Sequence, residues 1–325
     1  MNMITKENSV QHFNFDDWKN LPSRDTWIEP AAFTVMQRPV HVHNGNEFVE
    51  LPIDRAKAIV RRDNGAVLGI HKGRYSIINY EDAIDNLMIA IDQSRIDTSD
   101  CEAKCQVFEE GGKLRLNLRF NNHIIQPQIG DRTVITVNLE SSHDGTRATE
   151  TNVMDLRLVC LNGQTTPDFK LKSRQIHTEG NKQSPIEQMI QRINSGLDLF
   201  YSNEDKYKSW ISTPMNRNHV QSIFEETLAQ RPTRIKKRNV SEPILNQLMR
   251  NYDNELYQGN NNLFGAYNAA TAWATHPDTK GQVYNVDRVR HNEVAKMQRS
   301  SFWLAYDRFT RREYEESSKK MILVS

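Results

Sequence analysis

Hydrophobic and polar residues alternate with a period of two over much of the first half of the chain, a pattern typical of β-strands. Residues 33–42 lead into Asn44-Gly45, and a return strand begins at Phe48. Residues 56–62 lead into Asp63-Asn64-Gly65, after which residues 66–70 come back. Because an Asn-Gly pair supplies the positive φ angles of a tight turn, the pattern predicts two β-hairpins.

One helix is predicted next, and a longer stretch of alternating residues comes after it. Between Tyr80 and Asp92 the apolar residues recur at spacings of three and four, which predicts an amphipathic helix. From residue 113 to 120 leucines alternate with cations, so one face of the predicted strand is apolar and the other is cationic. Residues 135–139, 154–160 and 169–174 continue the alternation, with a turn at Asp144-Gly145.

The character changes after residue 180. Ser184-Pro185-Ile186-Glu187 is a capping box with proline at the first helical position, and it opens a helix. Further helices are predicted within residues 213–228, 241–256, 263–275 and 287–314. The fold class is therefore α+β: N-terminal antiparallel hairpins and a sheet with one packed helix, followed by a helical C-terminal half. We expect a strand-rich domain at 1–180 and a helical domain or extension at 181–325.

Composition excludes some classes of function but does not identify one. Lys and Arg number 42 against 41 Asp and Glu, so the net charge of +1 creates no global field for nucleic acid or anionic membrane. Three cysteines, Cys101, Cys105 and Cys160, are an odd number in a long chain, which favours a reducing, cytoplasmic setting. The N-terminus has no apolar core of a signal peptide, and no apolar stretch approaches the ~20 residues that cross a bilayer.

Two constellations resemble chemical sites. His41 and His43 would share one side of a strand, but no Cys/His cluster at ligand spacing supplies further metal ligands. Ser141-Ser142-His143-Asp144 contains the residue types of a catalytic triad, but neighbours in a hairpin turn point in different directions. Phosphate-binding glycine motifs are absent from the sequence. We therefore expect no cofactor, no metal and, on balance, no catalysis.

Cationic rows within the strands are the most unusual feature. The alternation places the members of each row on one face of a strand, and the first two rows contain no acidic residue. Such rows are what a protein that follows a phosphate backbone needs, although the outer face of any one-sided sheet is also polar. The candidate nucleic-acid-binding residues are Lys113, Arg115 and Arg119, then Lys170, Lys172 and Arg174, then Arg55, Lys57 and Arg61, with Lys236, Lys237 and Arg238 in a predicted linker.

Three segments resemble a known family. They are Val67–Tyr75 (VLGIHKGRY), Asn152–Gly163 (NVMDLRLVCLNG) and Phe264–His276 (FGAYNAATAWATH). Together they are similar to the phage/plasmid-like protein family of unknown function numbered 932. The resemblance implies a mobile-element origin and a strand-then-helix layout, but it brings no catalytic residues.

The order of elements is also similar to that of recombination annealases of the Rad and Red-beta type, a likeness at the level of fold alone. The leading hypothesis is a phage nucleic-acid-binding protein that handles or anneals single-stranded DNA in replication or recombination, with single-stranded DNA and further copies of itself as partners and no membrane.

Two alternatives stay open. One is a host-directed protein-interaction factor that docks through an exposed apolar patch on the C-terminal helices. The other is an enzyme with a dispersed site near His143, Asp155, Arg157 and Asn162, which a deep pocket and shifted pKa values would favour.

Overall fold

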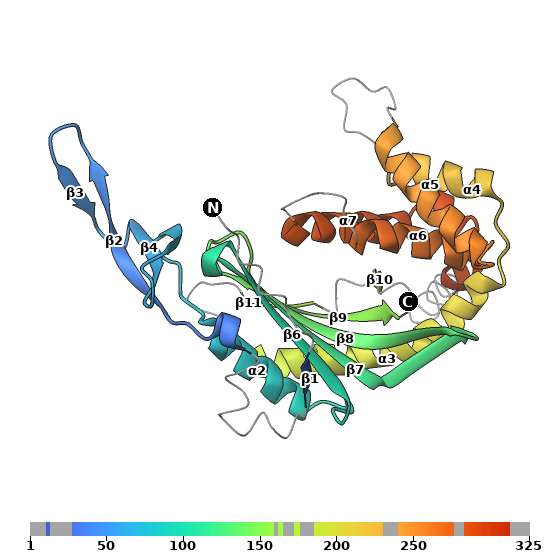
Figure 1. Cartoon of the computed structure of the whole chain (residues 1–325), viewed down its shortest axis with the longest axis horizontal. Coiled ribbons are helices and arrows are strands. Elements are labelled where there is room, and N and C mark those ends of the chain that lie inside the picture. The colour runs from blue at the N-terminus through green and yellow to red at the C-terminus, as the bar shows by residue number, and fades with distance from the viewer. Residues whose placement is uncertain are drawn as a thin grey trace, which may run out of the picture. The chain divides into compact units, whose positions relative to one another are not determined.

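The computed structural model describes residues 11–13, 28–158, 162–164, 172–175, 185–229, 240–275 and 283–312. Its strands form two antiparallel sheets in the N-terminal half, and helices make up most of the C-terminal half (Figure 1). The predicted α+β class is confirmed.

The smaller sheet has four strands in the order β3-β2-β4-β5. Both predicted hairpins are confirmed, with Gly45 (φ +104°) in the first turn and Gly65 (φ +74°) in the second. These φ angles are open to glycine at little cost, which is why the two turns form where they do. The strands are β2 (Val35–His43), β3 (Phe48–Leu51), β4 (Ala56–Arg61) and β5 (Val67–Lys72).

The larger sheet follows the order β1-β6-β7-β8-β9-β10, with β11 paired to the same strand β9. The alternating segments at 113, 135 and 154 are confirmed as strands, whereas the strand β6 has no counterpart among the predictions. The elements are β1 (Gln11–Phe13), β6 (Cys101–Phe108), β7 (Lys113–Gln128), β8 (Asp131–Ser142), β9 (Thr149–Arg157), β10 (Asn162–Gln164) and β11 (Lys172–Gln175), with short 3₁₀ helices η2 (Glu29–Ala31) and η3 (Glu109–Gly111).

The apolar face of β7 lies in the core. Leu114, Leu116, Leu118 and Phe120 are all fully buried, as the period-two pattern predicts. The helix α2 (Tyr80–Asp92) has the predicted bounds and buries one apolar side. The first half of α3 (Pro185–Ile211) packs on β9 so closely that a Cβ atom at Gly196 would lie 2.6 Å from the side chain of Val153.

The remaining helices confirm most of the C-terminal predictions and correct two of them. The helix predicted from residue 213 begins at Arg217, because the side chain of Asn216 accepts a hydrogen bond from the backbone N–H of His219. The helix predicted over 287–314 is broken at Ser300, which caps a new helix. The helices are α4 (Arg217–Glu226), α5 (Glu242–Tyr257), α6 (Leu263–Thr275), α7 (Val283–Met297) and α8 (Ser301–Leu304).

The chain groups into two compact units, and neither is a continuous segment. Unit 1 comes from residues 1–123, 135–153 and 169–198, and unit 2 from residues 124–134, 154–168 and 199–325. The strands β7, β8 and β9 and the helix α3 therefore contribute residues to both units. The expected domains at 1–180 and 181–325 concern independent folding, which this grouping by packing does not test. They therefore stay a prediction.

Candidate functional site

Lys113, the first cation of the row on β7, is held between two carboxylates. Its side chain is only 6% exposed, and its Nζ atom lies 2.6 Å from Glu109 and 3.4 Å from Asp144. Burial disfavours the charge on Lys113, but these two acidic neighbours outweigh it and raise the pKa of the ammonium group. Lys113 thus stays charged and paired within unit 1.

The other two cations of this row also have acidic partners on neighbouring strands. Arg115 lies 3.0 Å from Glu140 of β8, a carboxylate that also pairs with Arg147. Arg119 pairs with Glu102, which the sheet register places directly opposite it on β6. A phosphate approaching this row would have to displace a carboxylate, so the row offers little net positive charge.

The third predicted row, on β4 and the turn before it, is divided. Arg61 donates hydrogen bonds to Asp63 and to the carbonyl oxygen of Glu110, and its guanidinium lies 3.9 Å from the ring centroid of Phe33. Lys57 is 6% exposed. Arg55 is exposed. Of this row, only Arg55 is open to a ligand.

The remaining predicted cations lie in segments whose side chains the structure does not describe. Lys170, Lys236, Lys237 and Arg238 lie outside the described residues. Lys172 and Arg174 are described by their backbone alone, in β11, where they pair with Asn152 and Glu150 of β9. These candidates stay predictions.

A group of cations on the small sheet was mostly missed by the sequence reasoning. All of its members are exposed, and none makes an ion pair with a residue that the structure describes. Two members, Arg55 and Arg74, come from segments that touch, because Gly73 packs against Asp54 with no room for a Cβ atom. This contact brings the turn before β4 next to the turn after β5. We call this group the exposed cations: Arg38, Arg55, Arg62, Lys72 and Arg74.

One face of the small sheet carries exposed apolar and cationic side chains around the buried Ala58, and none of the residues within its four strands that lie on this face is acidic. The register aligns Arg38 with Ala58 and Ile70 in one row across the sheet, and pairs Val42 with Val49 and Ala56 with Lys72 on the same face. Val67 and Ile70 are each 63% exposed, values far above those of core residues. We call this surface the open face: Arg38, Val42, Val49, Val67, Ile70 and Lys72.

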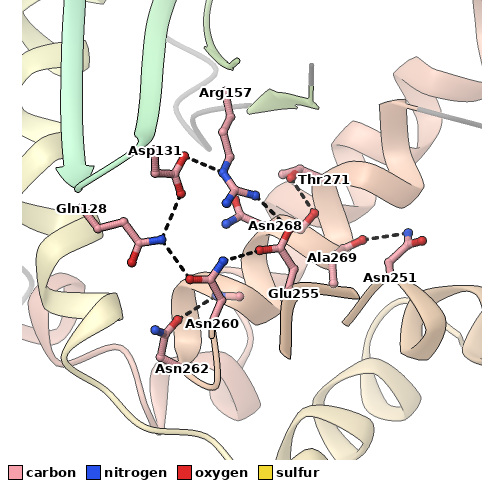
Figure 2. A network of polar contacts seen from close by, with 11 residues as sticks. Gln128, Asp131, Arg157, Asn251, Glu255, Asn260, Asn262, Asn268, Ala269 and Thr271 are labelled. Carbon is pink, nitrogen blue, oxygen red and sulfur yellow. Dashed lines mark hydrogen bonds and ion pairs between the residues drawn. The ribbon is translucent and has the colours of Figure 1, made fainter. Parts of the chain in front are cut away.

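Arg157, from the dispersed-enzyme hypothesis, lies in a buried polar network of unit 2 (Figure 2). Its Nε atom donates to Asp131 at 2.7 Å, and its Nη1 atom donates to Glu255 at 2.8 Å. Burial disfavours its charge, but these hydrogen bonds and charges together raise its pKa further.

Two amides close this network into a ring. Asn260 donates to the second oxygen of Glu255 at 2.6 Å, and Gln128 donates to Asn260 and to Asp131 at 2.9 and 3.2 Å. The ring joins the β7–β8 turn, the strand β9 and the end of α5 (Figure 2). Because its charged groups pair with one another, the ring holds these elements together and does not offer a substrate site.

Asp155 lies in a separate buried contact of unit 2. Its Oδ2 atom accepts hydrogen bonds from Asn203 and Tyr207, both at 2.7 Å. Burial raises the pKa of this carboxyl group to about 6, although both donors oppose the shift. A shifted pKa was expected at an enzyme site, but here the carboxyl group is sealed among side chains of α3.

The other members of the dispersed-enzyme hypothesis do not join Asp155. His143 belongs to unit 1, where its ring stacks on Tyr80 with centroids 4.1 Å apart. The side chain of Asn162 lies outside the described residues. An open pocket on α5 is lined by Gln247, Arg250, Asn251, Asp253 and Asn254, and contains neither Asp155 nor Arg157.

Other candidates from the sequence have simple surroundings. His41 lies 3.5 Å from Glu50, and the ring of His43 meets the edge of Phe48. Within the described residues, no group of three or more His, Cys, Asp or Glu side chains could hold a metal ion. Cys101 and Cys105 are free and buried, and burial raises the pKa of both thiols to about 12.

The helical half shows no broad apolar surface among its described side chains. Its exposed large apolar residues come from different helices: Tyr201 on α3, Tyr257 at the end of α5, Val289 on α7 and Phe302 on α8. The docking patch of the interaction-factor hypothesis is thus less evident on the helices than on the open face. None of the described helices has the length and apolarity to cross a bilayer.

Comparison with known proteins gives a family but no activity. No curated protein and no solved structure matches the chain. The family model described as "Domain of unknown function (DUF932)" matches residues 67–303, which include β5, the strands β6 to β9 and the helices through most of α8. The chain therefore belongs to the DUF932 family.

Proposed function

We propose that this protein binds single-stranded nucleic acid, and that it does so through the small sheet and not through the row on β7. The observation that carries the proposal is the contrast in charge pairing between the two sheets. Arg115 and Arg119 are paired with carboxylates, whereas the exposed cations have no ion-pair partner among the described residues. A free cation that neutralises a phosphate releases a counterion condensed on the nucleic acid, whereas a cation already paired with a carboxylate must first lose that partner.

The open face explains why a single strand is the preferred form. A single strand presents both phosphates and unpaired bases, and the open face combines cations with exposed apolar side chains. Phosphates would contact Arg38 and Lys72 while bases pack on Val67 and Ile70. A duplex hides its base faces, so it would gain only the electrostatic part. Annealing during phage replication or recombination in the cytoplasm is the setting that we propose for this binding.

Fluorescence anisotropy with a labelled single strand, and with a duplex of equal length, tests the proposal at several salt concentrations. We expect tighter binding of the single strand and a steep loss of affinity with salt. The Arg38→Ala/Arg55→Ala/Arg62→Ala variant should weaken binding and reduce the log–log salt slope by about 2, because each lost phosphate contact on a single strand removes about 0.7.

A matched variant controls for the loss of charge itself. Arg132, Arg250 and Arg308 are exposed cations of unit 2 that make no ion pair with a described residue. Replacing all three by alanine changes the net charge equally and should leave the salt slope unchanged. Absence of binding to the single strand at low salt would refute the proposed function.

A further inference from the structure

The small sheet ends in two strands that have no neighbour among the described residues. In the order β3-β2-β4-β5, the strand β3 is paired on one side by β2, and β5 is paired on one side by β4. An edge strand presents unpaired N–H and C=O groups, so it is a template for adding another strand. The molecule therefore carries two such templates in one sheet.

The two edges carry opposite charge. Glu47 and Glu50 lie at β3, whereas Lys72 and Arg74 lie at the end of β5. Glu50 lies 3.5 Å from His41 of its own copy, so Glu47 is the more available acid. A lysine on an edge strand is also a common device against edge pairing. The acidic residue on the opposite edge is what makes the two edges complementary.

Exposed apolar residues accompany the charge on both edges. Val49 of β3 is 42% exposed, and Val67 and Ile70 of β5 are each 63% exposed. The other face of β5 is fixed, because the Nε2 atom of His71 lies 2.7 Å from the carbonyl oxygen of His143. The β5 edge is thus held in place with its apolar side uncovered.

Strand direction and register fit these edges together. Each pairing in the sheet is antiparallel, so β3 and β5 run in opposite directions. A second copy in the same orientation would therefore meet β5 with an antiparallel β3. The alignment that places Val49 beside Ile70 also places Glu47 opposite Lys72, with all four side chains on the open-face side of the sheet.

We propose that copies of this chain associate head to tail, with β3 of one copy adding to β5 of the next. The contact is heterologous, because two different surfaces meet and the row of copies keeps a free β3 edge at one end and a free β5 edge at the other. This inference does not depend on nucleic-acid binding, and its tests are made without nucleic acid. A two-fold contact would instead oppose β5 to β5, and β5 carries no acidic residue that could pair with Lys72.

Light scattering coupled to size exclusion, over a series of protein concentrations, tests the association in the full chain. We expect the wild-type mass to rise with concentration beyond that of a dimer. Glu47→Lys and Lys72→Glu should each lose this rise and remain monomeric. The double variant Glu47→Lys/Lys72→Glu should regain it, because the exchanged charges are again opposite across the contact.

Mixing the two single variants gives the sharpest test. The Glu47→Lys copy keeps an intact β5 edge, and the Lys72→Glu copy keeps an intact β3 edge. The mixture should regain the rise in mass beyond a dimer, because the intact edges oppose Glu47 to Lys72 and the two altered edges also meet with opposite charges. Asp205→Lys and Arg250→Glu, which change exposed charges on α3 and α5, should leave the mass distribution of wild type unchanged.

Either of two results would overturn the proposal. One is a wild-type chain that stays monomeric throughout the concentration series. The other is a mixture of the two single variants that stays monomeric although each variant has the circular dichroism spectrum of wild type. Failure here would leave the salt-slope test of nucleic-acid binding untouched, because that test alters Arg38, Arg55 and Arg62 only.

Discussion

Asp155 shows how burial changes the chemistry of one residue. Its pKa is raised to about 6 in the folded protein, against about 3.9 for an unperturbed aspartate. The native state therefore holds the proton more tightly than the unfolded state does. The contribution of Asp155 to stability is greatest below about pH 4 and declines as pH rises toward 6, by about 3 kcal/mol at most.

Asp155→Asn should remove this decline. An amide oxygen accepts the hydrogen bonds from Asn203 and Tyr207 as the carboxyl oxygen does, and it carries no charge at any pH. Urea unfolding from pH 4 to pH 7 should show the variant gaining stability relative to wild type as pH rises. Asp205→Asn, an exposed acid on the same helix, is the control. Parallel curves for Asp155→Asn and wild type would contradict the prediction.

The sequence identifies which positions carry a charge, but it does not show whether that charge is free to bind a ligand. The alternation correctly assigned Arg115 and Arg119 to one face of a strand. Their partners Glu140 and Glu102 come from other strands, so pairing appears only once the register is known. The alternation of Glu102 with Cys101 and Ala103 in β6 was the available signal, and it was missed because that segment was not predicted as a strand.

At the scale of elements, the ring around Arg157 joins the β7–β8 turn, β9 and α5. Arg157→Met would leave Asp131 and Glu255 buried without their counter-charge, and breaking a buried ion pair from one side costs about 3–5 kcal/mol. We expect a loss of that size in the free energy of unfolding, measured in urea. The variant Arg157→Met/Asp131→Leu/Glu255→Leu should recover part of it, since no uncompensated charge remains.

An exposed pair provides the comparison for this prediction. Lys296 lies 2.6 Å from Glu293 on α7, where the lysine side chain is 69% exposed and the glutamate side chain 37%. Lys296→Met should cost less than about 1 kcal/mol, as is usual for surface pairs. If Arg157→Met cost no more than Lys296→Met, the ring would not be the tie that its geometry indicates.

Most elements could be predicted because their signals are local. Asn44-Gly45 and Asp63-Asn64-Gly65 fix two hairpins through backbone conformation alone, and the spacing of apolar residues fixes α2. The errors also have local causes. The helix α4 begins at Arg217 and not at the start of the predicted range, because Asn216 caps it, and Ser300 interrupts a segment that is otherwise helical in pattern.

At the scale of the whole molecule, a division at residue 180 follows the change from strands to helices but not the packing. Residues 185–198 of α3 belong to unit 1, where Asn194 accepts a hydrogen bond from the backbone N–H of Arg95. Residues 154–158 belong to unit 2 with the C-terminal helices. Sequence patterns report local periodicity, so they could not reveal that each unit is assembled from distant segments.

This interleaving predicts that the two halves do not fold alone. A fragment of residues 1–180 would keep Asp155 and Arg157 but lose Tyr207 and Glu255, and it would lose the helix that packs on Val153. It should therefore show no cooperative thermal transition by circular dichroism and should be degraded rapidly by protease, unlike the full chain. Co-expression with residues 181–325 should restore a protected complex, because all the missing partners are then present. A fragment 1–180 that melts cooperatively near the midpoint of the full chain would instead establish the boundary at 180 as a true domain limit.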